Sequence, residues 1–412
     1  MIITSDLHIH SKYSAATSPR MDLATLAKEA SRKGIQLLGT GDCLHPKWLS
    51  AIQELDAKDG LFYFKDNEAG TNFVLTVEVE DARRVHHLLI LPSIAKVEEL
   101  YESFCKYSTD IDSDGRPTLR LSGEEIAEHA KDVEALIGPC HAFTPWTALY
   151  AYYNSLHECY GDLSGYVSFL ELGLSADSSY ADRIKGLHTL TFLTNSDAHS
   201  PSPIRLAREF NRFLVQDMTF DELKAAIARE GGRKPVLNVG LPPKEGKYNE
   251  SACIRCYKHY SLREALIMKW RCACGGMIKK GVRDRVNELA DCDGTPPEHR
   301  PPYMHLIPLA EIIGLAVGKS ASSKTVTEIW ESLLAKFSTE VNVMVDTALE
   351  ELREVIRDDR VVEAIRAFRA AKIGVIPGGG GKYGIIVLNP EGSDEVAEPE
   401  RADKGQLSLF DF

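Results

Sequence analysis

Two short segments of this chain place histidines and carboxylates at a spacing that suits a metal site. The first, DLHIH, contains His8 and His10, and the second, NSDAH, contains Asp197 and His199. On a β-strand, residues two apart point to the same side, so each pair can offer two ligands to one ion. Further candidates stand near the ends of other apolar runs: Asp42, Glu78, His86, His87 and His141. This mixture of imidazoles and carboxylates favours Zn²⁺, Mn²⁺ or Fe over Ca²⁺.

The apolar runs that carry these residues have the length of buried β-strands. They are IIT, LLGTGD, FVLTVEVE, HHLLILP, ALIGPCH, FLELGL and TFLTNSDAH. Helical patterns lie between them, and in SGEEIAEHAKDV the residues Ser122 and Glu125 have the spacing of a capping box. This alternation over residues 1–230 predicts a parallel sheet or barrel with helices outside it. A barrel builds its active site at the C-terminal ends of such strands, where these ligands lie.

The order of the ligands resembles that of the PHP (polymerase and histidinol phosphatase) superfamily. Its members are distorted (β/α)₇ barrels that hold two or three metal ions and hydrolyse phosphoesters. The resemblance implies a set of catalytic metal ligands: His8, His10, Asp42, Glu78, His87, His141, Asp197 and His199. Asp42 is preferred over His45, and His87 over His86. A further histidine that often follows the first pair is missing from SKYSAA, so either two or three ions (Zn, Mn or Mg) are expected.

The chemistry that such a site supports is phosphoester hydrolysis. Two cations about 4 Å apart can bridge a phosphate, polarise it and lower the pKa of bound water towards neutrality. Both effects are needed, because the negative charge of a phosphoester repels hydroxide.

A second metal site is predicted where four cysteines cluster. Cys253 and Cys256 form a C-x₂-C pair, and Cys272 and Cys274 form a C-x-C pair. Four thiolates at this spacing are typical of one structural zinc ion.

The residues around the cysteines are strongly basic. The segment 252–285 contains nine Lys and Arg against two acidic residues, with aromatic residues between them. This composition predicts a surface that follows a nucleic-acid backbone, although a merely solvated charged face is the alternative. The predicted DNA contacts are Lys279, Lys280 and Arg283, together with Gly379, Gly380 and Lys382 of the later segment GGGGKYG.

The composition and the end of the chain bear on location and partners. Apolar content of 44%, charged content of 26% and no apolar run near the roughly 20 residues that span a bilayer predict a cytoplasmic protein without membrane contact. Residues 391–412, rich in Glu, Asp, Pro and Gly, predict a disordered acidic tail. Its last residues, QLSLFDF, resemble peptides that dock on a sliding clamp, either the bacterial beta clamp or archaeal PCNA. The clamp-binding candidates are Gln406, Leu409, Phe410 and Phe412.

These features divide the chain into four predicted parts. They are a PHP barrel (1–240), a zinc-binding basic module (247–300), a mainly helical domain with a Gly-rich loop (301–390) and the tail (391–412). The succession, with the motifs RPPYMHLIPLAEIIG and IPGGGGKYG, resembles the endonuclease Q family. The resemblance implies a DNA-repair endonuclease that cuts 5′ to deaminated bases (uracil, hypoxanthine, xanthine) and abasic sites. The alternatives are a phosphatase for a small phosphomonoester and a clamp-bound DNA-binding adaptor without catalysis.

Overall fold

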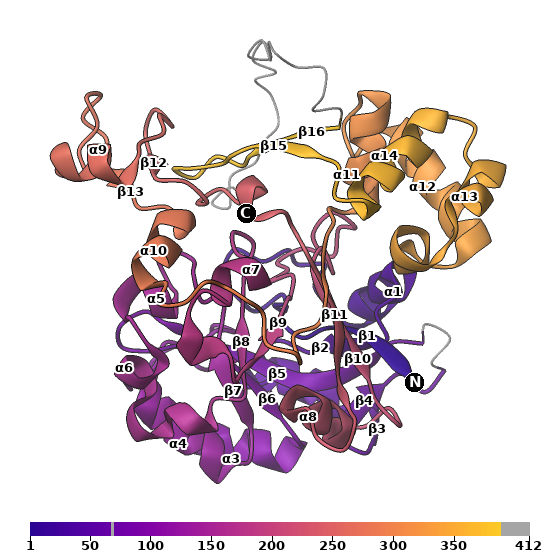
Figure 1. The fold of residues 1–412 in the computed structure, drawn as a ribbon. Coiled ribbons are helices and arrows are strands. Elements are labelled where there is room, and N and C mark those ends of the chain that lie inside the picture. The colour runs from indigo at the N-terminus through magenta and orange to yellow at the C-terminus, as the bar shows by residue number, and fades with distance from the viewer. Residues whose placement is uncertain (67–69, 389–412) are drawn as a thin grey trace.

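A ten-stranded mixed sheet forms the centre of the chain in this computed structural model, which describes residues 1–66 and 70–388 (Figure 1). From one edge of the sheet to the other, the neighbouring strands are β14 (Tyr303–His305), β11 (Lys234–Gly240), β10 (Phe210–Leu214), β1 (Ile2–Asp6), β2 (Leu37–Gly39), β5 (Asn72–Glu80), β4 (Leu61–Tyr63) and β3 (Asp56–Lys58). From β5 the sheet also continues through β6 (His86–Leu91) to β7 (Leu136–Pro139). A separate parallel pair consists of β8 (Phe169–Glu171) and β9 (Thr191–Leu193).

The predicted strands all exist, but the expectation of a parallel sheet is wrong. β1, β2 and β5 are parallel to one another, whereas β5, β6 and β7 are successively antiparallel, as are β1, β10 and β11. Only five residues separate β5 from β6, and a parallel connection needs a crossover of about a dozen residues or more.

The strands curve into a distorted barrel with two apolar layers. Ile3, Val74 and Phe213 belong to the inner cluster, while the outer cluster contains Leu75 and Val77 of the same strand β5. Individual hydrogen bonds join the separate β8–β9 pair to the large sheet. The amide of Ser168, just before β8, donates to the Ile137 carbonyl of β7 (2.8 Å), and the side-chain amide of Asn238 in β11 donates to the Phe192 carbonyl of β9 (3.2 Å). These hydrogen bonds fix the position of β8 and β9 relative to the rest of the barrel.

Helices cover the outside of the barrel because each presents one apolar face to it. Asp22 caps the first helix, whose end at Gly34 has φ 95°, a conformation that glycine adopts without a Cβ clash. The capping box of Ser122 and Glu125 is confirmed at the start of α4. The helices are α1 (Leu23–Lys33), α2 (Pro46–Gln53), α3 (Ile94–Phe104), α4 (Gly123–Asp132), α5 (Leu149–Tyr152), α6 (Leu156–Tyr160), α7 (Ser178–Ala181) and α8 (Phe220–Ala228).

The cysteine-containing segment forms a small module beside the barrel. Its two short strands, β12 (Ala252–Cys253) and β13 (Ile278–Lys279), are antiparallel, and α9 (Leu262–Ile267) lies between them in the sequence. Helix α10 (Val282–Leu289) leads back to the barrel, where the Arg285 guanidinium donates to the carbonyls of Tyr150 and Tyr153 (2.9 Å each).

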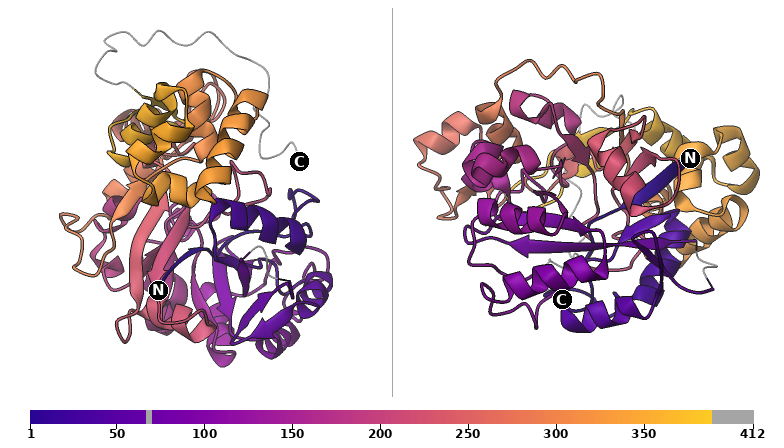
Figure 2. Two further views of the ribbon diagram at one scale, coloured as in Figure 1. Left: turned by 90° about the vertical axis from the view of Figure 1, so that its right-hand side faces the viewer. Right: turned by 90° about the horizontal axis from the view of Figure 1, so that it is seen from below.

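Four helices and a hairpin complete the described chain. The helices α11 (Leu309–Val317), α12 (Lys324–Phe337), α13 (Leu349–Val355) and α14 (Asp359–Arg369) gather on one side of the barrel, as both figures show (Figures 1 and 2). The hairpin of β15 (Gly374–Ile376) and β16 (Ile385–Val387) then extends from these helices towards the cysteine module (Figure 1). Within the part of the chain that the structure describes, no helix combines the length and apolarity needed to cross a bilayer.

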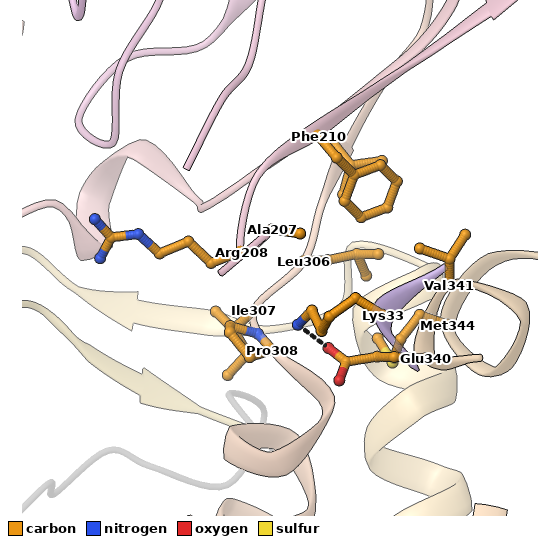
Figure 3. A pocket seen from close by; sticks show the side chains of 11 residues that line it. Lys33, Ala207, Arg208, Phe210, Leu306, Ile307, Pro308, Glu340, Val341 and Met344 are labelled. Carbon is orange, nitrogen blue, oxygen red and sulfur yellow. Dashed lines mark hydrogen bonds and ion pairs between the residues drawn. The ribbon is translucent and has the colours of Figure 1, made fainter. Parts of the chain in front are cut away.

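A buried ion pair ties the barrel to the C-terminal helices (Figure 3). The Lys33 ammonium of α1 lies 2.6 Å from the Glu340 carboxylate, and both side chains are almost fully buried. Glu340 also accepts hydrogen bonds from the Leu309 amide (3.0 Å) and the Trp330 indole (2.8 Å). Every oxygen of this carboxylate is therefore paired, which offsets the cost of burying the charge.

Candidate active site

The segments DLHIH and NSDAH, which the sequence predicts to bind metal, lie side by side in the structure. The Asp197 amide donates to the His8 carbonyl (2.9 Å), and the His10 amide donates to the Ala198 carbonyl (3.0 Å). Below them, the buried Asp6 carboxylate accepts hydrogen bonds from Ser196, including its amide at 3.0 Å. The backbone thus brings two pairs of residues almost 190 positions apart to one edge of the barrel.

Glu78, at the C-terminal end of β5, is the centre of the ligand cluster. Its Oε1 lies 3.1 Å from His141 Nε2 and 3.7 Å from His8 Nε2, and its Oε2 lies 3.3 Å from His10 Nε2. Asp197 Oδ1 is 3.2 Å from His10 Nε2 and 3.7 Å from His8 Nε2. The cluster therefore contains two adjoining ligand groups, one of His8, His10 and Asp197 and the other of Glu78, His86 and His141.

The unpaired atoms of this cluster fit bound cations. Four buried atoms have no hydrogen-bond partner among the described residues: Nε2 of His8, Nε2 of His10, Nδ1 of His141 and Oδ1 of Asp197. A buried polar atom without a partner is costly, whereas a divalent cation would satisfy an imidazole nitrogen and a carboxylate oxygen at once. The donor set matches the divalent metals expected from the sequence.

The electrostatics of the cluster show how strongly its charges are coupled. Burial alone would raise the pKa of Glu78, but the positive charges of His86 and His8 outweigh it and hold that pKa well below its usual range. Burial likewise opposes the charged form of His10, yet the neighbouring carboxylates of Asp197 and Asp42 raise its pKa well above normal. The low pKa values of Glu78 and Asp197 keep these two carboxylates ionised, which is the state that binds a metal.

Asp42, which the sequence predicts as a ligand, instead lies behind His10. Its Oδ1 is 3.1 Å from His10 Nδ1, and its Oδ2 accepts hydrogen bonds from the Ser11 amide (2.6 Å) and the Ser14 hydroxyl (2.9 Å). A carboxylate on the far nitrogen of an imidazole fixes the tautomer and orientation of that ring. Because both oxygens of Asp42 accept hydrogen bonds behind His10, this geometry suits a residue that positions the His10 ring.

The two neighbouring candidates His86 and His87 have different surroundings in the structure, and His86 is the one beside Glu78. Successive residues of β6 point to opposite faces, so His86 faces the barrel interior, where its Nδ1 lies 2.7 Å from Glu78. The His87 ring lies in the outer layer, with Nδ1 2.8 Å from the Tyr160 hydroxyl and Nε2 3.4 Å from Asp81. His86 is therefore the member of this pair that can share an ion with Glu78 and His141.

The remaining predicted histidines differ in their placement. The His199 ring lies 4.3 Å from the His10 ring, and its pKa falls to about 4 because of burial and the neighbouring charge of His10. The alternative candidate His45 stacks on Tyr13 with ring centroids 4.3 Å apart, at the start of α2. His199 thus belongs to the cluster, while His45 lies in an aromatic stack.

Three residues at the site have left-handed backbone conformations. Asp42, His141 and Asp197 have φ values of 48°, 30° and 49°. Such conformations cost of order 1 kcal/mol or more for residues other than glycine, and they concentrate at functional sites. Each of the three lies within four residues of the end of a strand, β2, β7 or β9.

Two further residues of the site are absent from the sequence prediction. The Glu171 carboxylate at the end of β8 lies 3.0 Å from His8 Nδ1, as Asp42 does for His10, and Arg116 lies 3.3 Å from Glu78 Oε2. Glu171 carries a usable signal, because FLELGL places an acidic residue inside an apolar run. Arg116 carries none, since it stands in a polar loop.

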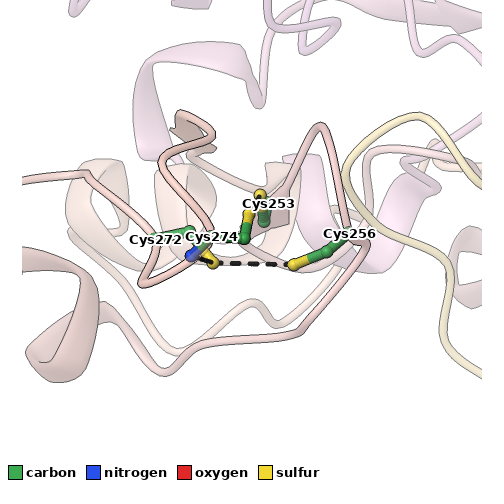
Figure 4. A group of neighbouring side chains, drawn as sticks. All are labelled: Cys253, Cys256, Cys272 and Cys274. Atoms are coloured by element: carbon green, nitrogen blue, oxygen red, sulfur yellow. Dashed lines mark hydrogen bonds between the residues drawn. The ribbon is translucent and has the colours of Figure 1, made fainter.

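The four cysteines converge as the sequence predicts (Figure 4). All four Sγ atoms lie within 4.8 Å of one another, and two Sγ···Sγ distances are 3.5 Å. A tetrahedral zinc site with Zn–S bonds of about 2.3 Å has S···S edges of about 3.8 Å, so the cluster fits that ion. The Tyr260 hydroxyl donates to Cys272 and lowers the pKa of that thiol to about 6, which favours the thiolate that zinc binds.

The predicted DNA-contact residues come together in the structure, yet most have intramolecular partners. Lys279 lies over the Trp146 ring at 3.4 Å from its centroid, and Lys280 pairs with Glu288 at 2.7 Å. Arg283 pairs with Glu250, the residue that forms a bridge with Gly379 of the hairpin loop.

The hairpin loop itself is partly buried in the module. Gly379 and Gly380 are buried against residues 250–253, whereas Lys382 is exposed. A Cβ on Gly379 would meet the Glu250 carbonyl and the Ala252 side chain, so glycine permits this close approach. The clamp-binding candidates Gln406, Leu409, Phe410 and Phe412 lie outside the described residues.

Comparisons with known proteins agree with this arrangement. The family described as the MJ0043 C-terminal domain matches residues 308–372. The uncharacterized protein MJ0043 of Methanocaldococcus jannaschii is 42% identical over 270 residues, which is 64% of this chain and 33% of that protein. The chain therefore spans about a third of that relative's length. The uncharacterized protein YqxK of Bacillus subtilis is 31% identical over 409 residues, covering 93% of this chain and 99% of that protein.

Solved structures extend the comparison over the whole fold. The crystal structure of PfuEndoQ, a lesion-specific endonuclease from Pyrococcus furiosus, is 51% identical with a TM-score of 0.90 and covers 95% of this chain and 96% of that one. A structure of endonuclease Q with a 27-mer duplex that carries an abasic lesion at the active site is 51% identical with a TM-score of 0.89. With the ligand cluster, these similarities define a metal-dependent nuclease. The chain belongs to the endonuclease Q family.

Proposed function

We propose that this chain is a lesion-specific DNA endonuclease that hydrolyses the phosphodiester 5′ to deaminated bases (uracil, hypoxanthine, xanthine) and abasic sites. The observation that carries the proposal is the cluster around Glu78, whose buried unpaired ligand atoms suit divalent cations. Support for a damaged duplex as substrate comes from the similarity, over 95% of the chain, to the endonuclease Q that was crystallised with an abasic-lesion duplex.

The residues of the cluster have different roles in the proposed hydrolysis. Divalent ions held by the two ligand groups would polarise the phosphate and lower the pKa of bound water. Glu171 and Asp42 hold the rings of His8 and His10 by their Nδ1 atoms, so that both Nε2 atoms face the centre. The Arg116 guanidinium, which pairs with Glu78, would add a positive charge near a phosphate bound at the cluster. The oxygen of water joins phosphorus and the 3′ oxygen leaves with a proton, which produces a 3′-hydroxyl and a 5′-phosphate.

A lesion-reading enzyme of this kind must also reach the damaged base. The Watson–Crick edge of a base is hidden in a duplex, so we expect the damaged nucleotide to be extruded before cleavage. The cysteine module, with one structural zinc, would support the surface on which the duplex lies, since its segment 252–285 is strongly basic.

The test is cleavage of labelled duplexes that each carry one lesion, with and without added chelator. We expect nicking 5′ to uracil, hypoxanthine, xanthine and abasic sites, none in an undamaged duplex, and loss of all cleavage with chelator. Asp197→Ala and His10→Ala should abolish nicking while DNA binding persists, because most phosphate contacts lie elsewhere. Glu350→Ala, which removes an exposed carboxylate from α13, is the matched control and should cleave as the wild type does.

The two rival functions make different predictions in the same experiment. A small-molecule phosphatase would turn over a chromogenic phosphomonoester and leave every duplex intact. A DNA-binding adaptor would bind the duplexes without cleaving either substrate. Wild-type nicking by Asp197→Ala would contradict the assignment of the active site.

We also propose that residues 406–412 recruit a sliding clamp. The support is the sequence QLSLFDF, in which the leucine and phenylalanine side chains can fill an apolar groove. Deletion of residues 405–412 should leave nicking of a short oligonucleotide unchanged and remove co-elution with the host's clamp. Normal clamp binding by the truncated protein would contradict the proposal.

A further inference from the structure

Arg208 and Lys247 lie near the ligand candidate Asp197, and Arg205 lies near Lys247. Arg205 and Arg208 lie in the loop after the D-x-H motif, and Lys247 lies in the segment that follows β11. The Arg208 Nε donates to the carbonyl of Ser196, the residue before Asp197 (3.1 Å). The guanidinium of Arg116, in contrast, pairs with Glu78 on the other side of the ligand cluster. Within residues 1–66 and 70–388, no carboxylate oxygen lies within 4.0 Å of the charged nitrogens of these three side chains.

The C-terminal hairpin brings Tyr383 to the same place. Three backbone hydrogen bonds hold its loop on the segment before the cysteine module: the amides of Gly378, Gly381 and Gly384 donate to the carbonyls of Lys244, Lys247 and Glu245 (2.8–2.9 Å). Lys247 Nζ lies 5.9 Å from the centroid of the Tyr383 ring and 5.5 Å from that of Tyr248. Residues 136 positions apart thus form one group.

The environment of this group favours an anion. Burial would raise the pKa of Tyr383, but the charges of Arg208, Lys247 and Arg205 outweigh it and lower that pKa. Burial also lowers the pKa of Lys247. Half-buried cations that repel one another are costly unless an anion neutralises them. Figure 3 shows that the Arg208 guanidinium points away from the Lys33–Glu340 pair, so that carboxylate does not neutralise it.

We propose that Lys247, Arg208 and Tyr383 bind one backbone phosphate of the DNA strand next to Asp197. The ammonium, the guanidinium and the phenol hydroxyl are all donors, and a phosphodiester offers two anionic oxygens that accept. The hairpin therefore completes the active site from the far end of the chain. This inference rests on the proposed function, because it assigns a binding site for the DNA that the nuclease cuts.

The test is the salt dependence of DNA binding, measured in the His10→Ala background so that the duplex is not cut. The probe is a labelled duplex with one abasic site. Lys247→Met should weaken binding about tenfold at low salt and reduce the slope of log K against log[salt] by about 0.9, the value for one lost phosphate contact. Lys247→Arg should restore the slope, because it keeps the charge. Tyr383→Phe should weaken binding without changing the slope, because the phenol is uncharged.

The control is Lys336→Met, which removes an exposed lysine on α12. A slope for Lys247→Met equal to that of this control would overturn the inference, and so would full affinity of Tyr383→Phe. Melting temperature and zinc content identify a variant that fails to fold, in which case the Lys247→Arg and Tyr383→Phe results decide. Nicking by the wild-type chain separately tests the proposed function: if the wild type cuts the abasic duplex while Lys247→Met matches the control, only the phosphate site fails.

Discussion

Replacing Glu171 with glutamine should reveal how the site holds its metal. The Glu171 carboxylate accepts hydrogen bonds from three donors: His8 Nδ1 (3.0 and 3.1 Å to its two oxygens), the His141 amide (2.9 Å) and the Asn195 side-chain amide (2.8 Å). In Glu171→Gln an NH₂ group takes the place of one oxygen. Each carboxylate oxygen of Glu171 accepts from two donors. Whichever oxygen the glutamine NH₂ group replaces, that NH₂ group therefore faces N–H donors instead of an acceptor.

The size of the effect follows from that mismatch. A buried donor without an acceptor costs about 1–3 kcal/mol, and loss of a group that orients a metal-binding histidine lowers metal affinity or activity by about 10–100-fold. We therefore expect the metal concentration for half-maximal nicking to rise by about 10–100-fold. Activity at saturating metal should recover largely, because Glu171 acts on the orientation of His8 rather than as a ligand.

The assay is the initial rate of nicking of an abasic duplex as a function of Mn²⁺ or Zn²⁺ concentration, after removal of bound metal. Glu128→Gln, an exposed residue of α4, is the matched control. The reasoning is refuted if Glu171→Gln has the same half-saturating metal concentration as the control. It is also refuted if no metal concentration restores activity while the protein remains folded, since Glu171 would then act in the reaction itself.

Three further changes test other parts of the structure. His86→Ala should reduce nicking by at least about 100-fold, because His86 faces Glu78, whereas His87→Ala should chiefly lower the melting temperature. Glu340→Ala should lower the free energy of unfolding in denaturant titration by about 3–5 kcal/mol, because it leaves the Lys33 ammonium buried without a partner. Cys253→Ser should remove one zinc per chain, measured by elemental analysis, and lower the melting temperature.

For each of these three predictions, a second variant or a specific outcome checks the reasoning. Equal loss of nicking in His86→Ala and His87→Ala would contradict the assignment of opposite faces. Combining Lys33→Met with Glu340→Leu should recover most of the lost stability, since neither charge is then buried. Unchanged zinc content in Cys253→Ser would mean that the cysteines hold no ion.

Local sequence was sufficient for the elements and for most of the ligand types. Apolar runs of strand length predicted β1, β2 and β5–β9, because burial on both faces leaves a continuous apolar pattern. The H-x-H and D-x-H spacings placed His8, His10 and Asp197 on one side of their segments without any knowledge of the fold. The cysteine spacing likewise predicted a cluster that the structure contains.

Tertiary structure alone decided how these pieces act together. Whether two strands run parallel or antiparallel depends on which strands pair in the folded sheet. His86, rather than His87, lies beside Glu78 because the face of β6 that carries His86 is turned to the barrel interior. Asp42 follows β2 and Glu171 is the last residue of β8, yet the position of each carboxylate behind an imidazole depends on contacts between segments far apart in the sequence. The approach of Tyr383 to Lys247 has no local signature, because it arises from a glycine loop packed on a distant segment. Short-range spacing is a property of one strand or turn, whereas the role of each side chain depends on neighbours that only folding brings within reach.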